Sequence, residues 1–85
     1  MEYFVYIIFS KIKNRFYIGS TSALKERLIR HNQNSKGFTG KVSDWEIMYS
    51  EPYDSKSKAL LRELQIKKWK SRKMIEKLIA DNKGI

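Results

Sequence analysis

Five side chains in this sequence are of types that could together hydrolyse a phosphodiester bond: Tyr6, Tyr17, Arg27, His31 and Glu63. Such a reaction requires a carboxylate that holds a metal ion while leaving sites open for water and substrate. It also requires a base for the attacking water and a cation that meets the charge developing on the phosphoryl oxygens. Glu63 supplies the carboxylate, Tyr17 or His31 the base, Arg27 the cation, and Tyr6 a second hydroxyl.

Each of these residues also has an ordinary structural interpretation. A tyrosine in a strand often packs its ring in the core, and Arg27 with His31 could form the solvated edge of a helix. Glu63 and Lys67 have the spacing of a routine helix ion pair, which is worth only ~0.3–0.5 kcal/mol. A single histidine is not a metal site by itself. Spacing alone therefore leaves a catalytic role and a structural role both open.

The two tyrosines are expected on a β-hairpin at the start of the chain. The segment from Tyr3 to Phe9 is apolar on both faces, which predicts a central strand that is covered on both sides. A turn at residues 10–14 leads into a returning strand from Arg15 to Gly19. If the loop has an even number of residues, Tyr6 and Tyr17 emerge on the same face. An odd loop or a bulge would separate them.

Arg27 and His31 are expected on a helix from about Ala23 to Asn32, which the hydroxyls of residues 20–22 can cap. On a helical wheel, both residues border the apolar stripe rather than oppose it. Glu63 is expected on a second helix, from about Lys56 to Trp69, which Asp54 or Ser55 can cap. Glu63 and Lys67 interrupt an arc bounded by four apolar residues, which are Ala59, Ile66, Leu60 and Leu64.

Two further elements complete the predicted fold. Residues 45–50 read as a third strand that Pro52 closes, and Ser71 can cap a third helix through Asp81. The buried stripe of that helix would be Met74, Ile75, Leu78 and Ile79. The order strand, strand, helix, strand, helix, helix predicts a small α/β (α+β) layer fold with an antiparallel sheet.

Composition limits the class of protein. Eighty-five residues with 41% hydrophobic content predict one domain, residues 1–85, and the absence of cysteine excludes disulfides and thiol chemistry. No apolar run is long enough to cross a membrane and no signal-peptide pattern occurs, so we expect a soluble cytoplasmic protein. The net charge of +9 favours polyanionic partners, nucleic acid first and acidic protein or membrane surfaces second. The alternative is a charged surface that serves solubility.

Several of these residues together resemble the motifs of the GIY-YIG nuclease family. The sequence reads Phe-Val-Tyr up to Tyr6 and Tyr-Ile-Gly from Tyr17, with Arg27 ten residues later and His31 four beyond that. Arg62-Glu63 and the run from Ile66 to Trp69 match the distal glutamate helix. The similarity covers the whole chain, is greatest to the small stand-alone branch of the family, and extends to the N-terminal nuclease domain of the bacterial excision-repair endonuclease.

This resemblance implies a three-stranded antiparallel sheet flanked by helices and a divalent-metal-dependent endonuclease that cleaves DNA. Glu63 would hold Mg²⁺ or Mn²⁺, and Arg27 would bind the scissile phosphate. Tyr17 would activate water, with Tyr6 and His31 orienting it or assisting proton transfer. His31, with an ordinary pKa near ~6.5, competes for the role of base with Tyr17, whose ordinary pKa is near ~10. Branched or damaged DNA is the substrate that the family suggests.

Two departures from the family pattern bear on activity. Ser20 stands where some members carry a lysine, and the asparagine that some relatives carry after the glutamate has no counterpart. A binding module of the same fold, without cleavage, is therefore the competing hypothesis. Its nucleic-acid contacts would come from the basic run around Trp69, from Arg27, and from two lysines of the polar loop that follows the first helix. The full set is Arg27, Lys36, Lys41, Lys67, Lys68, Lys70, Arg72 and Lys73. A third hypothesis is a subunit that docks onto a repair protein.

Overall fold

A three-stranded antiparallel sheet lies at the centre of the molecule. The computed structural model describes residues 2–33 and 42–83. The strands are β1 (Tyr3–Ser10), β2 (Arg15–Thr21) and β3 (Glu46–Tyr53), arranged in the order β2-β1-β3. The prediction of a central first strand is confirmed, because β1 pairs with a neighbour along each of its edges.

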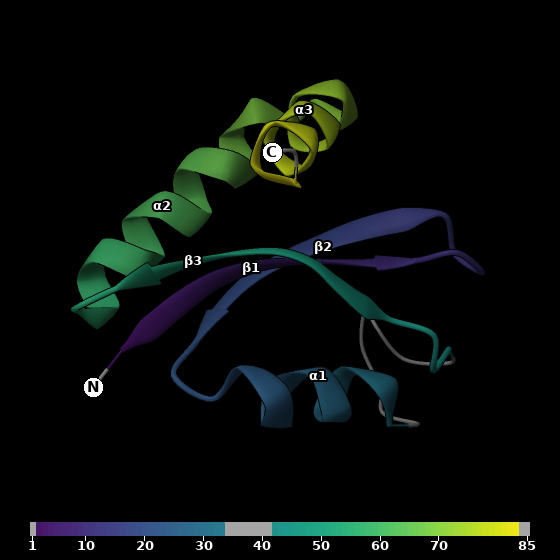
Figure 1. Cartoon of the computed structure of the whole chain (residues 1–85), viewed down its shortest axis with the longest axis horizontal. Helices are drawn as coiled ribbons and strands as arrows, with labels where there is room; N and C mark the ends of the chain where they lie inside the picture. Colours follow the sequence, from purple (N-terminus) through teal and green to yellow (C-terminus); the bar gives the residue numbers. More distant parts are fainter. Residues whose placement is uncertain (1, 34–41, 84–85) are drawn as a thin grey trace.

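Helices cover both faces of this sheet. Helix α1 (Leu24–Asn32) lies on one face, while α2 (Lys56–Trp69) and α3 (Arg72–Lys83) lie on the other (Figure 1). The element order is β-β-α-β-α-α, so the predicted α+β layer fold is confirmed. None of the helices in the described segments is long and apolar enough to span a bilayer.

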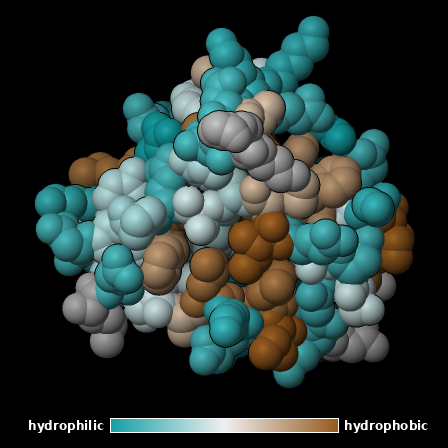
Figure 2. Space-filling view, viewed as in Figure 1, coloured by the Kyte–Doolittle hydropathy of each residue, from teal (hydrophilic) through white to brown (hydrophobic). Residues whose placement is uncertain are grey.

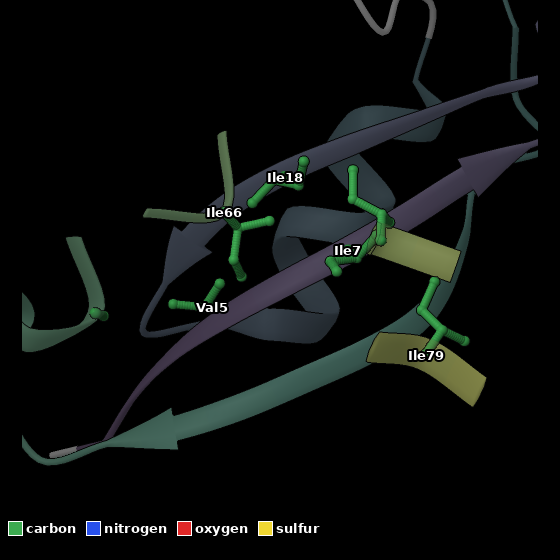
Figure 3. Close-up of a cluster of buried hydrophobic side chains, with 7 residues drawn as sticks. Val5, Ile7, Ile18, Ile66 and Ile79 are labelled. Atoms are coloured by element: carbon green, nitrogen blue, oxygen red, sulfur yellow. The ribbon is translucent and has the colours of Figure 1, made fainter. Parts of the chain in front are cut away.

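Two apolar clusters hold these layers together. Because successive strand residues point to opposite faces, the apolar run of β1 supplies both clusters. On the α2 and α3 side, buried aliphatic side chains of the sheet and the two helices meet (Figure 3); they include Val5, Ile7, Ile18, Ile66 and Ile79. On the α1 side, the buried members are Tyr6, Ile8 and Trp45. The first tyrosine of the candidate site is therefore also a core residue.

The predicted end of the third strand is wrong. Strand β3 runs through Pro52 to Tyr53, and Pro52 pairs with Phe4 of β1. Proline cannot donate a backbone hydrogen bond, but β3 lies at an edge of the sheet, where one side of the strand needs no partner. A register shift between Ile7 and Ile8 marks an irregularity in the same pairing.

The predicted helix caps are partly confirmed. Helix α2 begins after Ser55, whose hydroxyl accepts the Lys58 N–H at 3.2 Å. In contrast, α1 is preceded by Ala23 and has no side-chain cap, so the predicted hydroxyl cap is wrong. Ser20 belongs to β2 instead, and the Thr21 hydroxyl accepts the Ala23 N–H at 3.0 Å before the helix begins.

The apolar stripes of the last two helices are narrower than predicted. Ala59 and Ile66 are buried, whereas Leu60 and Leu64 are 41% and 53% exposed. The apolar contact of helix α2 with the core is made by Ala59 and Ile66, and the leucines are largely in solvent. On α3, Ile75 and Ile79 are buried but Met74 is 45% exposed.

Figure 2 shows hydrophobic residues gathered over the middle and lower part of one face of the molecule, with hydrophilic residues around them.

Candidate active site

The hairpin brings Tyr6 and Tyr17 to the same face of the sheet. Ser10 pairs with Arg15, so the loop contains four residues, and Asn14 closes it with a φ of 54°. In this register Tyr6 lies opposite Gly19, and Tyr17 lies opposite Ile8. Because Tyr6 and Ile8 are two residues apart in β1, both tyrosines face α1. The even-loop prediction is confirmed, and the two ring centroids are 6.4 Å apart.

Gly19 makes room for the Tyr6 side chain. A Cβ atom at position 19 would lie 2.5 Å from the Tyr6 hydroxyl oxygen and 2.7 Å from the adjacent ring carbon. Real Cβ atoms essentially never approach other atoms so closely. The Tyr6 ring therefore crosses the backbone of β2, and its hydroxyl reaches the edge of the sheet. The glycine of the Tyr-Ile-Gly motif is thus required by packing.

Helix α1 places His31 against both tyrosines. The His31 Nε2 atom lies 2.8 Å from the Tyr6 hydroxyl oxygen, and the imidazole centroid is 4.9 Å from that of Tyr17. The end of the helix is fixed to the sheet by Asn32, whose side-chain amide exchanges two hydrogen bonds, of 2.8 and 3.0 Å, with the backbone of Trp45. The His31 side chain is buried, so the contact is made inside the protein.

The electrostatics of this cluster favour neutral side chains. Burial, followed by the neighbouring Tyr17, raises the pKa of Tyr6 far above its ordinary value, while the guanidinium of Arg27, which hydrogen-bonds to it, acts in the opposite direction. Burial, followed by the positive charges of Arg27 and Arg30, lowers the pKa of His31 below its ordinary value of 6.5. Near neutral pH, Tyr6 is therefore a phenol and His31 a neutral imidazole.

Glu63 reaches the same edge of the sheet from the other face. Its Oε1 atom accepts a hydrogen bond of 2.7 Å from the Ser20 hydroxyl, and its Oε2 atom lies 2.7 Å from the ammonium of Lys67. Ser20 follows Gly19 in β2, and the charge of Glu63 contributes to the raised pKa of Tyr6. The structure therefore gathers Tyr6, His31 and Glu63 around the end of β2.

Arg27 lies between solvent and the tyrosine cluster, which consists of Tyr6, Tyr17 and His31. Its side chain is half-buried, and it lines two small cavities at the junction of β2 and α1, of about 160 and 280 Å³. Ser22 lines both of these cavities. A guanidinium carries five N–H groups, so Arg27 retains donors after its contact with Tyr6.

The donor set around Glu63 suits a hard cation that keeps most of its water. Within the described residues, no three histidine or acidic side chains gather to hold a metal ion. Mg²⁺ is often bound through one or two carboxylates with waters in its remaining positions, so a single glutamate is compatible with it. The Glu63 side chain is 14% exposed, and its Oε2 faces Lys67, which is 45% exposed and able to move away. The donor set therefore fits a divalent cation once the Lys67 ammonium moves away from Oε2.

Among the predicted nucleic-acid contacts that the structure describes, Lys67, Lys70 and Arg72 line one cavity, whereas Arg27 and Lys68 line others. Arg72 donates to the backbone carbonyl and side chain of Asn14 at 3.0 and 2.9 Å and stacks on two phenylalanines. Lys68 lines a different cavity, beside Leu64. Trp69 packs against the apolar core beneath Arg62, whose guanidinium carbon lies 5.6 Å from the ring centroid.

The remaining predicted lysines differ in what can be said of them. Lys70 ends α2 with a φ of 49° and lines a cavity together with Lys67, and Lys73 is exposed on α3. Lys36 and Lys41 lie outside the described residues.

Two residues of the site were not singled out as functional by sequence reasoning. The sequence suggests Ser20 as a possible helix cap and as a replacement for lysine, whereas in the structure its hydroxyl orients Glu63. The sequence suggests Asn32 as the end of a helix, whereas in the structure its amide ties α1 to the residue before β3. Gly19 was the one position with a usable signal, because a glycine inside a strand often marks a close approach of another group.

Comparison with known proteins places the chain in a family. Residues 2–77 match the GIY-YIG catalytic domain. A UPF0213 protein of Staphylococcus saprophyticus is 33% identical over 94% of this chain and 96% of its own length. A UPF0213 protein of Natronomonas pharaonis is 32% identical over 98% of this chain and 96% of its own length. The solution NMR structure of a UPF0213 protein from Bacillus halodurans superposes with a TM-score of 0.61, at 26% identity, over 99% of this chain and 88% of that one. The chain belongs to the GIY-YIG catalytic domain family, in the branch of small proteins that includes these UPF0213 relatives.

Proposed function

We propose that this chain is an endonuclease that uses one divalent cation, Mg²⁺ or Mn²⁺, to hydrolyse DNA phosphodiester bonds, with branched or damaged DNA as the substrate class. The observation that carries the proposal is the meeting of a buried Tyr6–His31 hydrogen bond and a Ser20-held Glu63 at one end of β2. A tyrosine, a neutral imidazole and a carboxylate serve no common packing purpose, whereas metal-assisted hydrolysis uses all three.

Glu63 is the residue that would hold the cation. When bound, the ion would polarise the phosphate and lower the pKa of a coordinated water. The hydrogen bond from Ser20 to Oε1 keeps the carboxylate oriented. The cation would therefore bind at Oε2, where it would replace the Lys67 ammonium. Ser20 would thus act as a positioning residue for Glu63.

Tyr17 is the proposed base, and the Tyr6–His31 pair supports it. The raised pKa of Tyr6 keeps its hydroxyl protonated, so this hydroxyl can donate to the neutral imidazole of His31 but is a poor proton acceptor. The Nε2 atom of His31 is engaged by Tyr6, and the ring is buried. Tyr17 is only half-buried and packs against both rings, which leaves it better placed to meet solvent.

Arg27 would bind the scissile phosphate. It lines the cavities that open beside the end of β2, and a guanidinium forms paired hydrogen bonds with phosphate oxygens.

Cleavage of labelled DNA tests this proposal. Single-stranded, duplex, flap and junction DNA would be incubated with Mg²⁺, with Mn²⁺ or with chelator. Glu63→Ala should abolish metal-dependent cutting, and Tyr17→Phe should reduce it by roughly 10²–10⁴-fold, the usual contribution of a general base. Glu46→Ala, which removes an exposed carboxylate of β3, is the matched control and should cut normally. Cutting that survives Glu63→Ala would refute the assigned metal site.

One observation favours the alternative of a nucleic-acid-binding module without cleavage. Both oxygens of Glu63 already accept protein hydrogen bonds, so the carboxylate is satisfied without a metal ion. Under this alternative, no DNA would be cut with either cation, while binding would remain strong and sensitive to salt.

A further inference from the structure

A basic groove lies next to Glu63, between the start of β2 and the junction of α2 with α3. Its volume is about 630 Å³, within the ~300–1,000 Å³ common for ligand sites. Four cationic side chains line it, namely Arg15, Lys67, Lys70 and Arg72, and its apolar lining includes Phe16 and Ile18. The lining contains no carboxylate among the residues that the structure describes. The groove therefore has the charge of an anion site and an apolar floor.

Arg72 is held in place as one wall of this groove. Two of its nitrogens donate to Asn14, at 2.9 and 3.0 Å, and a third donates to Glu76 at 3.1 Å. The guanidinium carbon lies 5.3 Å from the Phe16 ring centroid. Stacked guanidinium and aromatic planes are surfaces on which nucleic-acid bases stack. This wall exists before any ligand arrives.

The other cations are less constrained. Arg15 and Lys70 form no salt bridge within residues 2–33 and 42–83. Lys70 lines the groove at the end of α2, where its backbone adopts a left-handed conformation with a φ of 49°. Arg15 is the first residue of β2 and is exposed. Both are therefore available to phosphate groups.

We propose that this groove binds an unpaired strand of the nucleic-acid substrate, a proposal that rests on the nuclease function proposed above. Phosphates would be met by Arg15 and Lys70, and bases by the apolar floor and the Phe16–Arg72 stack. The bases of a duplex are hidden inside the helix, so a cationic groove with an apolar floor matches a strand whose bases are exposed.

The groove is continuous with the candidate active site. Lys67 lines the groove, and its ammonium is 2.7 Å from Glu63. Strand β2 is an edge strand, with the groove on the α2 side and the tyrosine cluster on the α1 side. A bound strand would cross this edge, placing the phosphate near Glu63 at the boundary between paired and unpaired substrate.

Binding measurements without metal test this assignment. Fluorescence anisotropy would be recorded in chelator at several salt concentrations, with a blunt duplex and with the same duplex carrying a single-stranded tail. Arg15→Gln and Lys70→Asn are the test variants, since asparagine tolerates the left-handed conformation. Lys77→Gln is the matched control, because it removes the same charge from an exposed position of α3 that does not line the groove.

Each groove variant should weaken binding of the tailed duplex by about 3- to 10-fold and reduce the salt slope by about 0.7, the value for one single-strand phosphate contact. Lys77→Gln should change neither quantity, and blunt duplex should be bound equally by all proteins. Equal losses in Lys77→Gln and the groove variants, equal losses on blunt duplex, or no loss at all would each refute the proposal that the groove binds an unpaired strand. Because the binding assay contains no metal, its result does not depend on whether the protein cleaves DNA. If the groove variants weaken binding but the wild type cuts no DNA with either cation, only the proposed nuclease function is refuted.

Discussion

Replacing Lys67 by methionine is expected to strengthen the binding of Mn²⁺ at Glu63. The Lys67 ammonium lies 2.7 Å from Oε2, the oxygen that a cation would need, while Ser20 keeps Oε1. A metal ion must therefore displace Lys67 before it can bind. Methionine retains much of the aliphatic stem of lysine and removes only the competing charge.

The size of the effect follows from the exposure of the pair. Lys67 is 45% exposed and Glu63 14%, so the pair is only partly shielded from water. Exposed ion pairs contribute ~0.2–1 kcal/mol, and the low exposure of the carboxylate places this pair near the upper end. A gain of about 1 kcal/mol corresponds to roughly 5-fold tighter metal binding.

Isothermal titration of Mn²⁺ into the protein without DNA measures this difference directly. Lys68→Met is the control, because it removes the same net charge from the adjacent position, and its affinity for Mn²⁺ should change by less than about 2-fold. Glu63→Gln should abolish the binding. If Lys67→Met binds Mn²⁺ no more tightly than Lys68→Met does, the ion pair does not compete with the metal, and the assignment of Glu63 as ligand loses its support.

Three further predictions concern stability. Glu51→Gln should lower the free energy of unfolding, measured in urea, by about 2–3 kcal/mol. The Glu51 carboxylate is 16% exposed and accepts hydrogen bonds from two tyrosine hydroxyls and from Arg62. A loss below about 0.5 kcal/mol would contradict this network. Folding lowers the pKa of His31, so the unfolded chain takes up a proton at a higher pH than the folded chain does. The contribution of His31 to the free energy of unfolding is therefore complete above its unfolded pKa of 6.5, and it is lost as the pH falls through the lower folded value. Wild type should therefore be less stable at about pH 5.5 than at about pH 7.5, and His31→Gln should show a smaller difference; equal differences in the two proteins would refute the assignment. Gly19→Ala should cost about 1–3 kcal/mol through its clash with the Tyr6 ring, and thermal unfolding should show a smaller cost in a Tyr6→Leu background; a cost that is the same in both backgrounds would mean that the ring is not the obstacle.

Local patterns in the sequence were sufficient for the elements and for the hairpin face. The even loop and the strict alternation of a strand place Tyr6 and Tyr17 together without any knowledge of the rest of the chain. The helical spacing of Arg27 and His31 along the apolar stripe of α1 is equally local. Element boundaries were less secure, as Pro52 shows, because tolerance of a proline depends on whether a strand lies at the edge of the sheet.

Tertiary structure alone decided how the two faces of the sheet meet at the end of β2. Ser20 and Glu63 are 43 residues apart, and no periodicity in the sequence relates a strand hydroxyl to a carboxylate on a later helix. The same holds for the 2.8 Å contact between Tyr6 and His31, which depends on the docking of α1 and on the absence of a side chain at Gly19. The sequence by itself determined which residue types were present and which faces they occupied. Their distances, their burial and the shifted pKa values of Tyr6 and His31 arise only when separate elements pack, because desolvation and Coulomb interaction depend on distances through space.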